Sequence, residues 1–206
     1  MKVAIVGGTG AFGRALAARL RDLDFDVAVG SRDHQRGWER GVELGVRGGS
    51  NEEIAGDADL VVLAVKSNAA LTTARELADT IGETPVLCVA SDLRFTEDGV
   101  LPGRESRSLA EELAETIAAP VASGLQSVSA VELSGNEPPD QDALVCGDDG
   151  QAKKLALEVA GKLVAGRAID VGPLANSRAL EAMTAVILNV NKQYKAHAGV
   201  RLTGLP

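Results

Sequence analysis

Residues 3–20, VAIVGGTGAFGRALAARL, contain the local pattern that decides the fold. The apolar run at 3–6 is typical of a buried strand, and residues 11–23 carry apolar side chains at helical spacing. The glycines between them have the spacing of a dinucleotide-binding turn, in which one allows a tight turn, one admits the pyrophosphate and one lets helix and strand pack closely. We expect free amides at the helix start to hold an anion there. The predicted cradle comprises Gly8, Thr9, Gly10, Ala11, Phe12 and Gly13.

The first 90 residues repeat this alternation of strand and helix. Further strands are predicted at 25–30, near 45–47, at 58–66 and at 84–90, with helical segments between them, including one that starts at Ser50 and one at 71–81. Strands that alternate with helices form parallel sheets with helices on both faces. The sequence therefore predicts an α/β protein with a Rossmann-type, doubly wound parallel sheet.

The second half of the chain is less regular. Residues 91–106 show no clear period, and a helix at 108–117 and a sixth strand at 119–125 follow. Beyond the loop EPPDQ, we expect a strand at 143–149, a helix at 151–164, a strand at 167–172 and one long helix over 174–198. This places a dinucleotide-binding domain at 1–140 and a small C-terminal α/β lobe at 141–206. The long helix has more apolar surface than such a lobe covers, so we expect a homodimer.

Composition narrows the class of protein. The net charge of −8 argues against nucleic-acid binding through a basic surface, and aromatics are only 2%, so the core must be aliphatic. Cys88 and Cys146 lie in apolar runs without metal-ligand spacing, which predicts buried, reduced thiols and no metal site. No run reaches the ~18 apolar residues of a membrane span. We expect a cytoplasmic protein with no membrane partner.

The end of the second strand indicates which dinucleotide binds. VGSRD at 29–33 lies about twenty residues beyond the glycines, where an acid binds the ribose of NAD and an arginine accommodates the extra phosphate of NADP. Ser31, Arg32 and Arg36 supply a hydroxyl and two guanidinium groups there. Asp33 falls on the following helix, where we expect it to face water. These residues predict NADP.

The opposite side of the site should come from other strand exits, because ligands bind beyond the carboxyl ends of such strands. The predicted wall comprises Ala64, Val65, Lys66, Ala90 and Gln126.

No side chain stands out as a catalytic acid or base. The chain has no Tyr-x-x-x-Lys pair and no Ser/His/Asp set, and we interpret His34 as a surface residue and His197 as a cation in the last helical turn. Reduction of a ketone needs a proton donor near the reacting carbon. Hydride transfer between two cofactors needs only orientation and electrostatics from the protein, and it suits this chain better.

Two further strings are more specific than the glycine turn: ALVCGDDGQAKK at 143–154 and IDVGPLANSRALEAMTAVILNVN at 169–191. Together with 3–20 and 29–33, they resemble the NADPH-dependent reductases of the deazaflavin coenzyme F420. The resemblance implies a deazaflavin in the cleft between a Rossmann part and a C-terminal lobe. It also implies reversible hydride transfer between C4 of the nicotinamide and C5 of the deazaflavin. The family positions that contact NADPH correspond to Thr9, Ser31, Arg32 and Arg36.

The chain departs from the family pattern at two segments that should face the rings. Members often carry His and Pro where this chain has Gln126 and Ser129, and many carry a Pro-aromatic pair in place of Lys66 and Ser67. Two alternatives therefore stay open: an NADPH-dependent reductase of another small oxidant (a flavin, a metal chelate or an imine), and a non-catalytic NADP-binding regulatory protein. The candidates to hold the coenzyme's anionic glutamyl tail are Arg94, Arg104 and Arg107.

Overall fold

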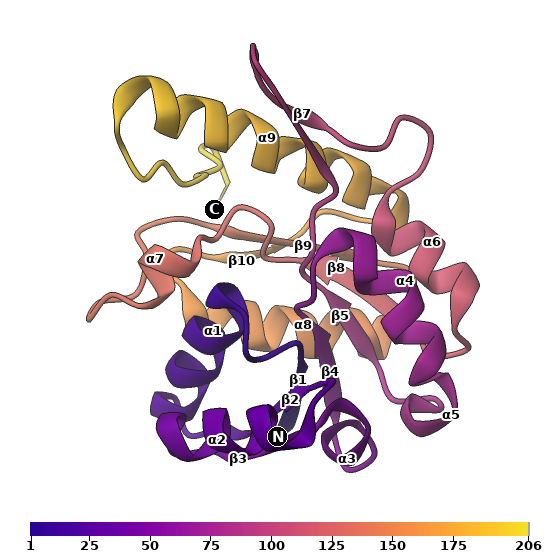
Figure 1. Cartoon of the computed structure of the whole chain (residues 1–206). Coiled ribbons are helices and arrows are strands. Elements are labelled where there is room, and N and C mark those ends of the chain that lie inside the picture. Colours follow the sequence, from indigo (N-terminus) through magenta and orange to yellow (C-terminus); the bar gives the residue numbers. More distant parts are fainter. Residues whose placement is uncertain (206) are drawn as a thin grey trace.

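A computed structural model describes residues 1–205 of the chain (Figure 1). Its centre is an eight-stranded sheet in the order β10-β9-β8-β5-β4-β1-β2-β3. All neighbouring strands run parallel except β8 and β9, which are antiparallel. The doubly wound sheet predicted from the sequence is thereby confirmed. The strands are β1 (Lys2–Val6), β2 (Asp26–Ser31), β3 (Arg47–Ser50), β4 (Leu60–Leu63), β5 (Val86–Cys88), β8 (Val121–Gly124), β9 (Ala143–Gly147) and β10 (Ala168–Asp170).

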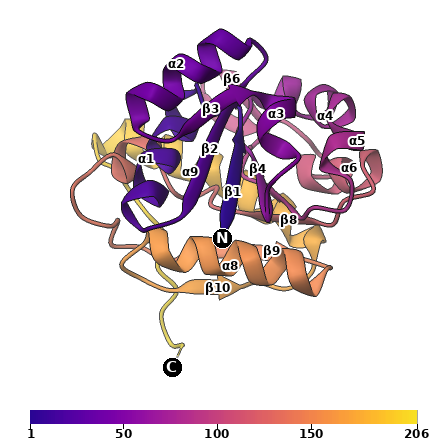
Figure 2. The same cartoon turned by 90° about the horizontal axis from the view of Figure 1, so that it is seen from below.

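Helices cover both faces of this sheet (Figure 2). One apolar cluster joins the sheet to α1 and α8, and a second joins the opposite face to α3, α4, α5 and α6. The large side chains that are fully buried are aliphatic apart from Gln141, as the low aromatic content predicts. The helices are α1 (Ala11–Asp22), α2 (His34–Leu44), α3 (Asn51–Ala55), α4 (Ser67–Glu76), α5 (Ala78–Ile81), α6 (Leu109–Thr116), α7 (Ala130–Leu133), α8 (Gly150–Leu163) and α9 (Ser177–Tyr194).

The C-terminal residues extend the same sheet. β9 reverses direction beside β8, and β10 runs parallel to β9. The long helix expected from residue 174 begins as a 3₁₀ turn at Leu174–Asn176 and continues as α9, which ends where Lys195 takes a left-handed φ of 50°. The boundary near residue 140 stays a prediction.

Three expected elements differ from the structure. The strand predicted near 45–47 is β3, because Gly45 adopts a left-handed φ of 66° that ends α2. The helix predicted at 71–81 starts at Ser67 and divides into α4 and α5. The stretch 91–106, predicted to be irregular, contains a hairpin of β6 (Leu93–Thr96) and β7 (Gly99–Pro102).

That hairpin depends on a contact distant in sequence. The backbone N–H of Val100 donates to Asn189 Oδ1 (2.9 Å), and Asn189 Nδ2 donates to the Val100 carbonyl (2.8 Å). Asn189 lies on α9 and thus pairs with β7 as a neighbouring strand would. Figure 1 shows the hairpin rising beside this helix.

The C-terminal segment is tied to the sheet by Asp142. Its carboxylate accepts hydrogen bonds from the backbone N–H of Arg167 and of Leu202, both at 2.9 Å, and from Arg167 Nη2 at 2.9 Å. The Asp142 N–H donates to the carbonyl of Val200 (2.7 Å). The Arg167 side chain, followed by these backbone donors, holds the pKa of Asp142 well below its usual range.

No helix within residues 1–205 combines the length and the apolar character that a bilayer span needs.

Helix α2 packs unusually close to the edge strand β3 through glycines. A Cβ built on Gly37 would lie 1.8 Å from the carbonyl oxygen of Gly49, and one on Gly41 would lie 2.6 Å from Gly48 Cα. Both obstacles are backbone atoms, which cannot rotate away. The distance between this helix and the sheet is therefore set by the glycines of GWERG at 37–41 and of RGGS at 47–50.

We expect Gly37→Ala to lower the free energy of unfolding by about 1–3 kcal/mol, because the new methyl group must push α2 away from β3. The matched control is Gly150→Ala, since a Cβ there meets nothing within 4 Å. Its stability should stay equal or rise slightly. Urea unfolding followed by circular dichroism measures both variants, and equal stability of the two would contradict this packing argument.

Candidate functional site

The glycine turn joins β1 to α1 at the carboxyl edge of the sheet. Gly7, with φ of 80°, makes the tight turn; the sequence-based prediction gave this role to Gly8. Gly8 instead packs against β2: a Cβ on it would lie 2.8 Å from Val29 Cβ. A Cβ on Gly13 would lie 2.7 Å from Gly8 Cα, so Gly13 sets the close contact of helix and turn as predicted. Beside Gly10, the nearest atom to an added Cβ is the Gly7 carbonyl at 3.5 Å, which leaves the turn open to a ligand.

The start of α1 presents amides without acceptors. Gly10 is its N-cap and supplies no side chain. Within residues 1–205, the N–H groups of Ala11, Phe12 and Gly13 have no hydrogen-bond partner, whereas the next amide, of Arg14, bonds to the Gly10 carbonyl. Free amides and the helix dipole at this end attract an anion. These residues therefore fit a pyrophosphate.

The end of β2 supplies positive charge to the same edge. Ser31 is buried, while Arg32 and Arg36 are exposed and form no ion pair within residues 1–205. Asp33 is exposed as expected, and its carboxylate also caps α2 by accepting the backbone N–H of Arg36 (2.7 Å). The two guanidinium groups have no acidic partner within the described residues, and the neighbouring carboxylate of Asp33 is occupied in capping α2. This arrangement suits a phosphate better than a ribose hydroxyl.

His34 lies at the surface near this edge, as predicted. Its Nε2 is 3.3 Å from Glu53 Oε2, and both side chains are more than half exposed. The Ser50 N–H donates to the Glu53 carboxylate (2.7 Å), and this bond is the main reason that the pKa of Glu53 lies below its ordinary value. Together with the Ser50 hydroxyl, which accepts the Glu53 N–H, it forms a capping box at the start of α3.

The exits of β4 and β5 lie beside the glycine turn. Val65 Cγ1 would be 2.6 Å from a Cβ on Gly7, and the Ala64 N–H donates to the Val6 carbonyl (2.9 Å). Lys66 follows as the exposed N-cap of α4, and Ala90 is a buried residue just after β5. The structure thus brings three of the predicted wall residues, Ala64, Val65 and Lys66, to the edge that carries the amides.

Gln126 follows β8 and is buried. Its Nε2 donates to the carbonyl of Cys88 (3.1 Å) and to Ser123 Oγ (2.8 Å), while its Oε1 is buried without a partner in the described chain. The space beside it, against α9, is too small to hold a water molecule. The wide empty cleft that a flat ring requires is therefore absent here, because side chains from α9 fill it.

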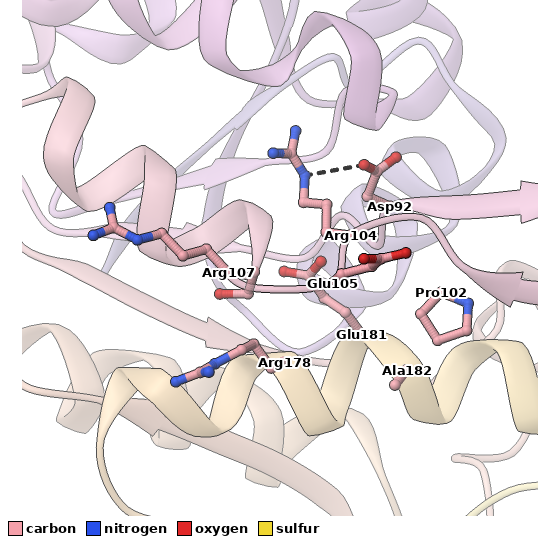
Figure 3. A pocket seen from close by; sticks show the side chains of 9 residues that line it. Asp92, Pro102, Arg104, Glu105, Arg107, Arg178, Glu181 and Ala182 are labelled. Atoms are coloured by element: carbon pink, nitrogen blue, oxygen red, sulfur yellow. Dashed lines mark ion pairs between the residues drawn. The ribbon is translucent and has the colours of Figure 1, made fainter.

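A larger cavity of about 240 Å³ lies outside the predicted site, between the 103–108 loop and the start of α9 (Figure 3). Arg104 pairs with Asp92 (3.0 Å) and Glu112, Arg107 pairs with Glu115, and Arg178 pairs with Glu111 (3.1 Å). The basic and acidic side chains that line this cavity balance one another, so the cavity is not an anion site. Two of the three arginines predicted to hold an anionic tail, Arg104 and Arg107, therefore already have acidic partners, whereas Arg94 has none within residues 1–205.

Glu181 lies in the wall of this cavity with only 4% of its surface exposed. Its carboxylate accepts a long hydrogen bond from the Ala110 N–H (3.4 Å) at the start of α6. Burial raises the pKa of Glu181 to about 7, and the amides around it offset only part of that shift. This carboxyl group is the main titratable group near neutral pH that the sequence interpretation missed.

The two thiols are inert. Cys88 and Cys146 are free and buried, and burial raises the pKa of each to about 12, so neither serves as a nucleophile. Within residues 1–205, no three His, Cys, Asp or Glu side chains are arranged to hold a metal ion. His197 lies beyond the end of α9 and not in its last turn, because the helix stops at Tyr194.

Asn51 was not predicted but supports the site. It is 6% exposed, and its Oδ1 accepts the N–H of Gly7 (3.3 Å) across 44 residues of sequence. This bond holds the glycine turn against α3. A buried asparagine at a helix start gives no signal in a single sequence.

Comparison with known proteins agrees with this geometry. A family model described as "NADP oxidoreductase coenzyme F420-dependent" matches residues 2–91. The F420-dependent NADP reductase of Methanocaldococcus jannaschii is 33% identical over all of this chain and 99% of its own, and that of Methanothermobacter thermautotrophicus is 31% identical over 100% and 96%. A solved structure from Arthrobacter, provisionally named an F420-dependent NADP reductase, superposes with a TM-score of 0.86 over 99% of this chain and 100% of that chain, at 24% identity. An imine reductase of Streptomyces aurantiacus shares only the fold, with a TM-score of 0.64 over 95% of this chain and 62% of that chain, at 19% identity. By its full-length identity to these reductases, the chain belongs to the F420-dependent NADP reductase family.

Proposed function

We propose that this protein transfers a hydride reversibly between NADP(H) and the deazaflavin coenzyme F420. The observation that carries the proposal is the pairing of a free-amide turn with two unpaired arginines at the same sheet edge, in a chain of this family. The amides suit the pyrophosphate, and the arginines suit the phosphate that distinguishes NADP from NAD.

NADP binds along the exits of β1 and β2. The pyrophosphate lies on the turn formed by Gly8, Thr9, Gly10, Ala11, Phe12 and Gly13. Ser31, Arg32 and Arg36 hold the 2′-phosphate. Asp33 does not compete for the ribose, since its carboxylate already accepts the Arg36 amide. Both arginines lie on the surface, so an incoming phosphate displaces water and not a protein carboxylate.

Ala64, Val65, Lys66 and Ala90, at the exits of β4 and β5, would form the wall against the nicotinamide. Gln126, beyond β8, would face the second ring once the α9 side chains that fill the space beside it move aside. When bound, the two cofactors supply the chemistry: a hydride passes between nicotinamide C4 and deazaflavin C5, and solvent exchanges the accompanying proton. The protein's residues bind and orient the two rings, and this role requires no proton donor from the protein.

The two cofactors correspond to two parts of the chain. We propose that residues 1–140 act as the dinucleotide-binding domain and residues 141–206 as the lobe that covers the second ring. We propose a cytoplasmic enzyme of small-molecule cofactors, and the net charge of −8 supports the lack of a nucleic-acid partner. It also means that an anionic cofactor must be held by local positive groups such as Arg32, Arg36 and Lys66.

We also propose a homodimer. Large apolar side chains are exposed on α9 and on the neighbouring hairpin: Val186 by 60%, Tyr194 by 69%, Phe95 by 73% and Leu101 by 43%. The hairpin and α9 contact one another, so these side chains belong to neighbouring elements, which we propose a second copy covers.

Mixing the protein with NADPH and oxidised F420 should bleach the deazaflavin absorbance rapidly, and NADH should bleach it far more slowly. The control is the same mixture without protein. Turnover with a flavin or an imine, but not with F420, would show that the protein reduces another small oxidant. Tight NADPH binding without turnover of any acceptor would leave a regulatory NADP-binding protein.

Arg32→Ala should raise the KM for NADPH about tenfold or more, which corresponds to the ~1.5–3 kcal/mol of a hydrogen bond to a charged group. The KM for NADH should stay unchanged, because NADH lacks the phosphate. Arg75→Ala removes an equally exposed arginine from the far end of α4 and serves as the control. An unchanged NADPH KM in Arg32→Ala would overturn the assignment of NADP to this edge.

Sedimentation equilibrium should give twice the chain mass of 21.2 kDa at micromolar concentration. Val186→Glu should shift the protein toward the monomer, because a charge would then be buried at the proposed interface. Val131→Glu, at an equally exposed valine on α7, should remain dimeric. A monomeric wild-type protein would refute the proposed dimer.

A further inference from the structure

The side chain of Gln126 is fixed in one orientation. Its Nε2 donates to the Cys88 carbonyl at 3.1 Å and to Ser123 Oγ at 2.8 Å, and 8% of the residue is exposed. The Cys88 carbonyl can only accept, so the amide nitrogen must face it. Both N–H bonds of the amide are thereby used, and the oxygen must point to the other side.

The amide oxygen of Gln126 is shielded from solvent, and no protein donor within residues 1–205 replaces the lost water. Oε1 of Gln126 is buried and has no hydrogen-bond donor in the described chain. Buried polar atoms in folded proteins are almost always paired, and the exceptions call for an explanation such as a missing ligand. An acceptor that is rigidly held and unpaired is prepared for a donor that arrives from outside the chain.

Two features constrain the backbone around Gln126. Leu125, just before it, has a left-handed φ of 69°, which is strained for a branched side chain. Thr184 on α9 donates through Oγ1 to the Gln126 carbonyl (3.0 Å) and is hydrogen-bonded to Ser91 beyond β5 (2.8 Å). Strain of this kind persists only where the surroundings enforce it, and it is common at ligand sites.

The space beside Gln126 is closed by side chains, and a ring can enter only if one of them moves. It is lined by Gln126, Ser127, Leu144, Leu180 and Met183. Met183 is partly exposed and has a flexible thioether side chain, so it can move aside and admit a ring from the solvent. An entering ring would then meet apolar walls and one unpaired acceptor.

We propose that Gln126 Oε1 selects the second substrate by accepting a hydrogen bond from an imide N–H on the edge of a flat heterocycle. This inference rests on the proposed function and deepens it, because the pyrimidinedione ring of a deazaflavin carries such an imide at N3. A flavin carries the same imide, whereas a metal chelate or a simple imine substrate has no equivalent donor. Ser123 acts as a positioning residue, since it helps to fix the amide that presents the oxygen.

The test measures binding, with turnover excluded. Oxidised deazaflavin and its N3-methyl derivative are titrated by fluorescence quenching into protein saturated with NADP+. The wild type should bind the methyl derivative about tenfold or more weakly, because methylation removes the donor and adds bulk at the acceptor. Gln126→Leu should bind the parent deazaflavin about tenfold more weakly than the wild type and should discriminate little between the two compounds. Its Kd for NADP+ should stay within twofold of the wild-type value.

Two variants guard against an unfolding artefact. Gln126→His, whose imidazole keeps one acceptor nitrogen, should restore much of the discrimination. Gln193→Leu, at an exposed glutamine at the end of α9, should match the wild type. Equal deazaflavin Kd values in Gln126→Leu and wild type would overturn the proposal, as would a parallel loss of NADP+ binding. If wild-type protein binds no deazaflavin at all, the proposed function fails and this contact with it; if it binds but ignores N3 methylation, only the contact fails.

Discussion

The contact between Gly13 and Gly8 governs the arrangement of everything at the carboxyl edge of the sheet. With no Cβ at either residue, the first turn of α1 lies directly against the loop that leaves β1, and its amides stay clear of protein acceptors. The exits of β2 and β4 pack on the same loop through Val29 and Val65. The cradle, the arginines and the nicotinamide wall therefore share one frame, and a displacement of the turn would move all of them together.

The parts of this edge that the sequence predicted are those encoded locally. Glycine spacing after an apolar run identifies the turn, and Arg32 is recognisable because strand length fixes where β2 ends. Gly7 and Asn51 escaped prediction since their roles depend on a hydrogen bond that spans 44 residues. The β6–β7 hairpin was missed for the same reason, because Asn189 on α9 supplies the strand-like partner of Val100.

The two C-terminal strings that carried the family resemblance correspond to the elements that close the second half of the site. Residues 143–154 form β9 and the first turns of α8, and residues 169–191 form the end of β10, the 3₁₀ turn and most of α9. Leu144, Leu180 and Met183 line the void beside Gln126, and Thr184 holds its carbonyl. The family model matches only residues 2–91, whereas the relatives match over the full length, these two strings included. The hydrogen bonds of Gln126 itself could not be predicted, because its partners come from two different strands.

Asp142 gives the end of the chain a structural role. Its one carboxylate bonds the amides of Arg167 and Leu202, so the start of β10 and the C-terminal segment converge on a single group at the start of β9. Because the pKa of Asp142 is lowered in the folded chain, its stabilisation is complete above the ordinary aspartate pKa and is lost only as acid protonates the folded form. The C-terminal segment thus completes a connection between the parallel strands β9 and β10. Truncation before Leu202 would leave the Asp142 carboxylate bonded to Arg167 alone.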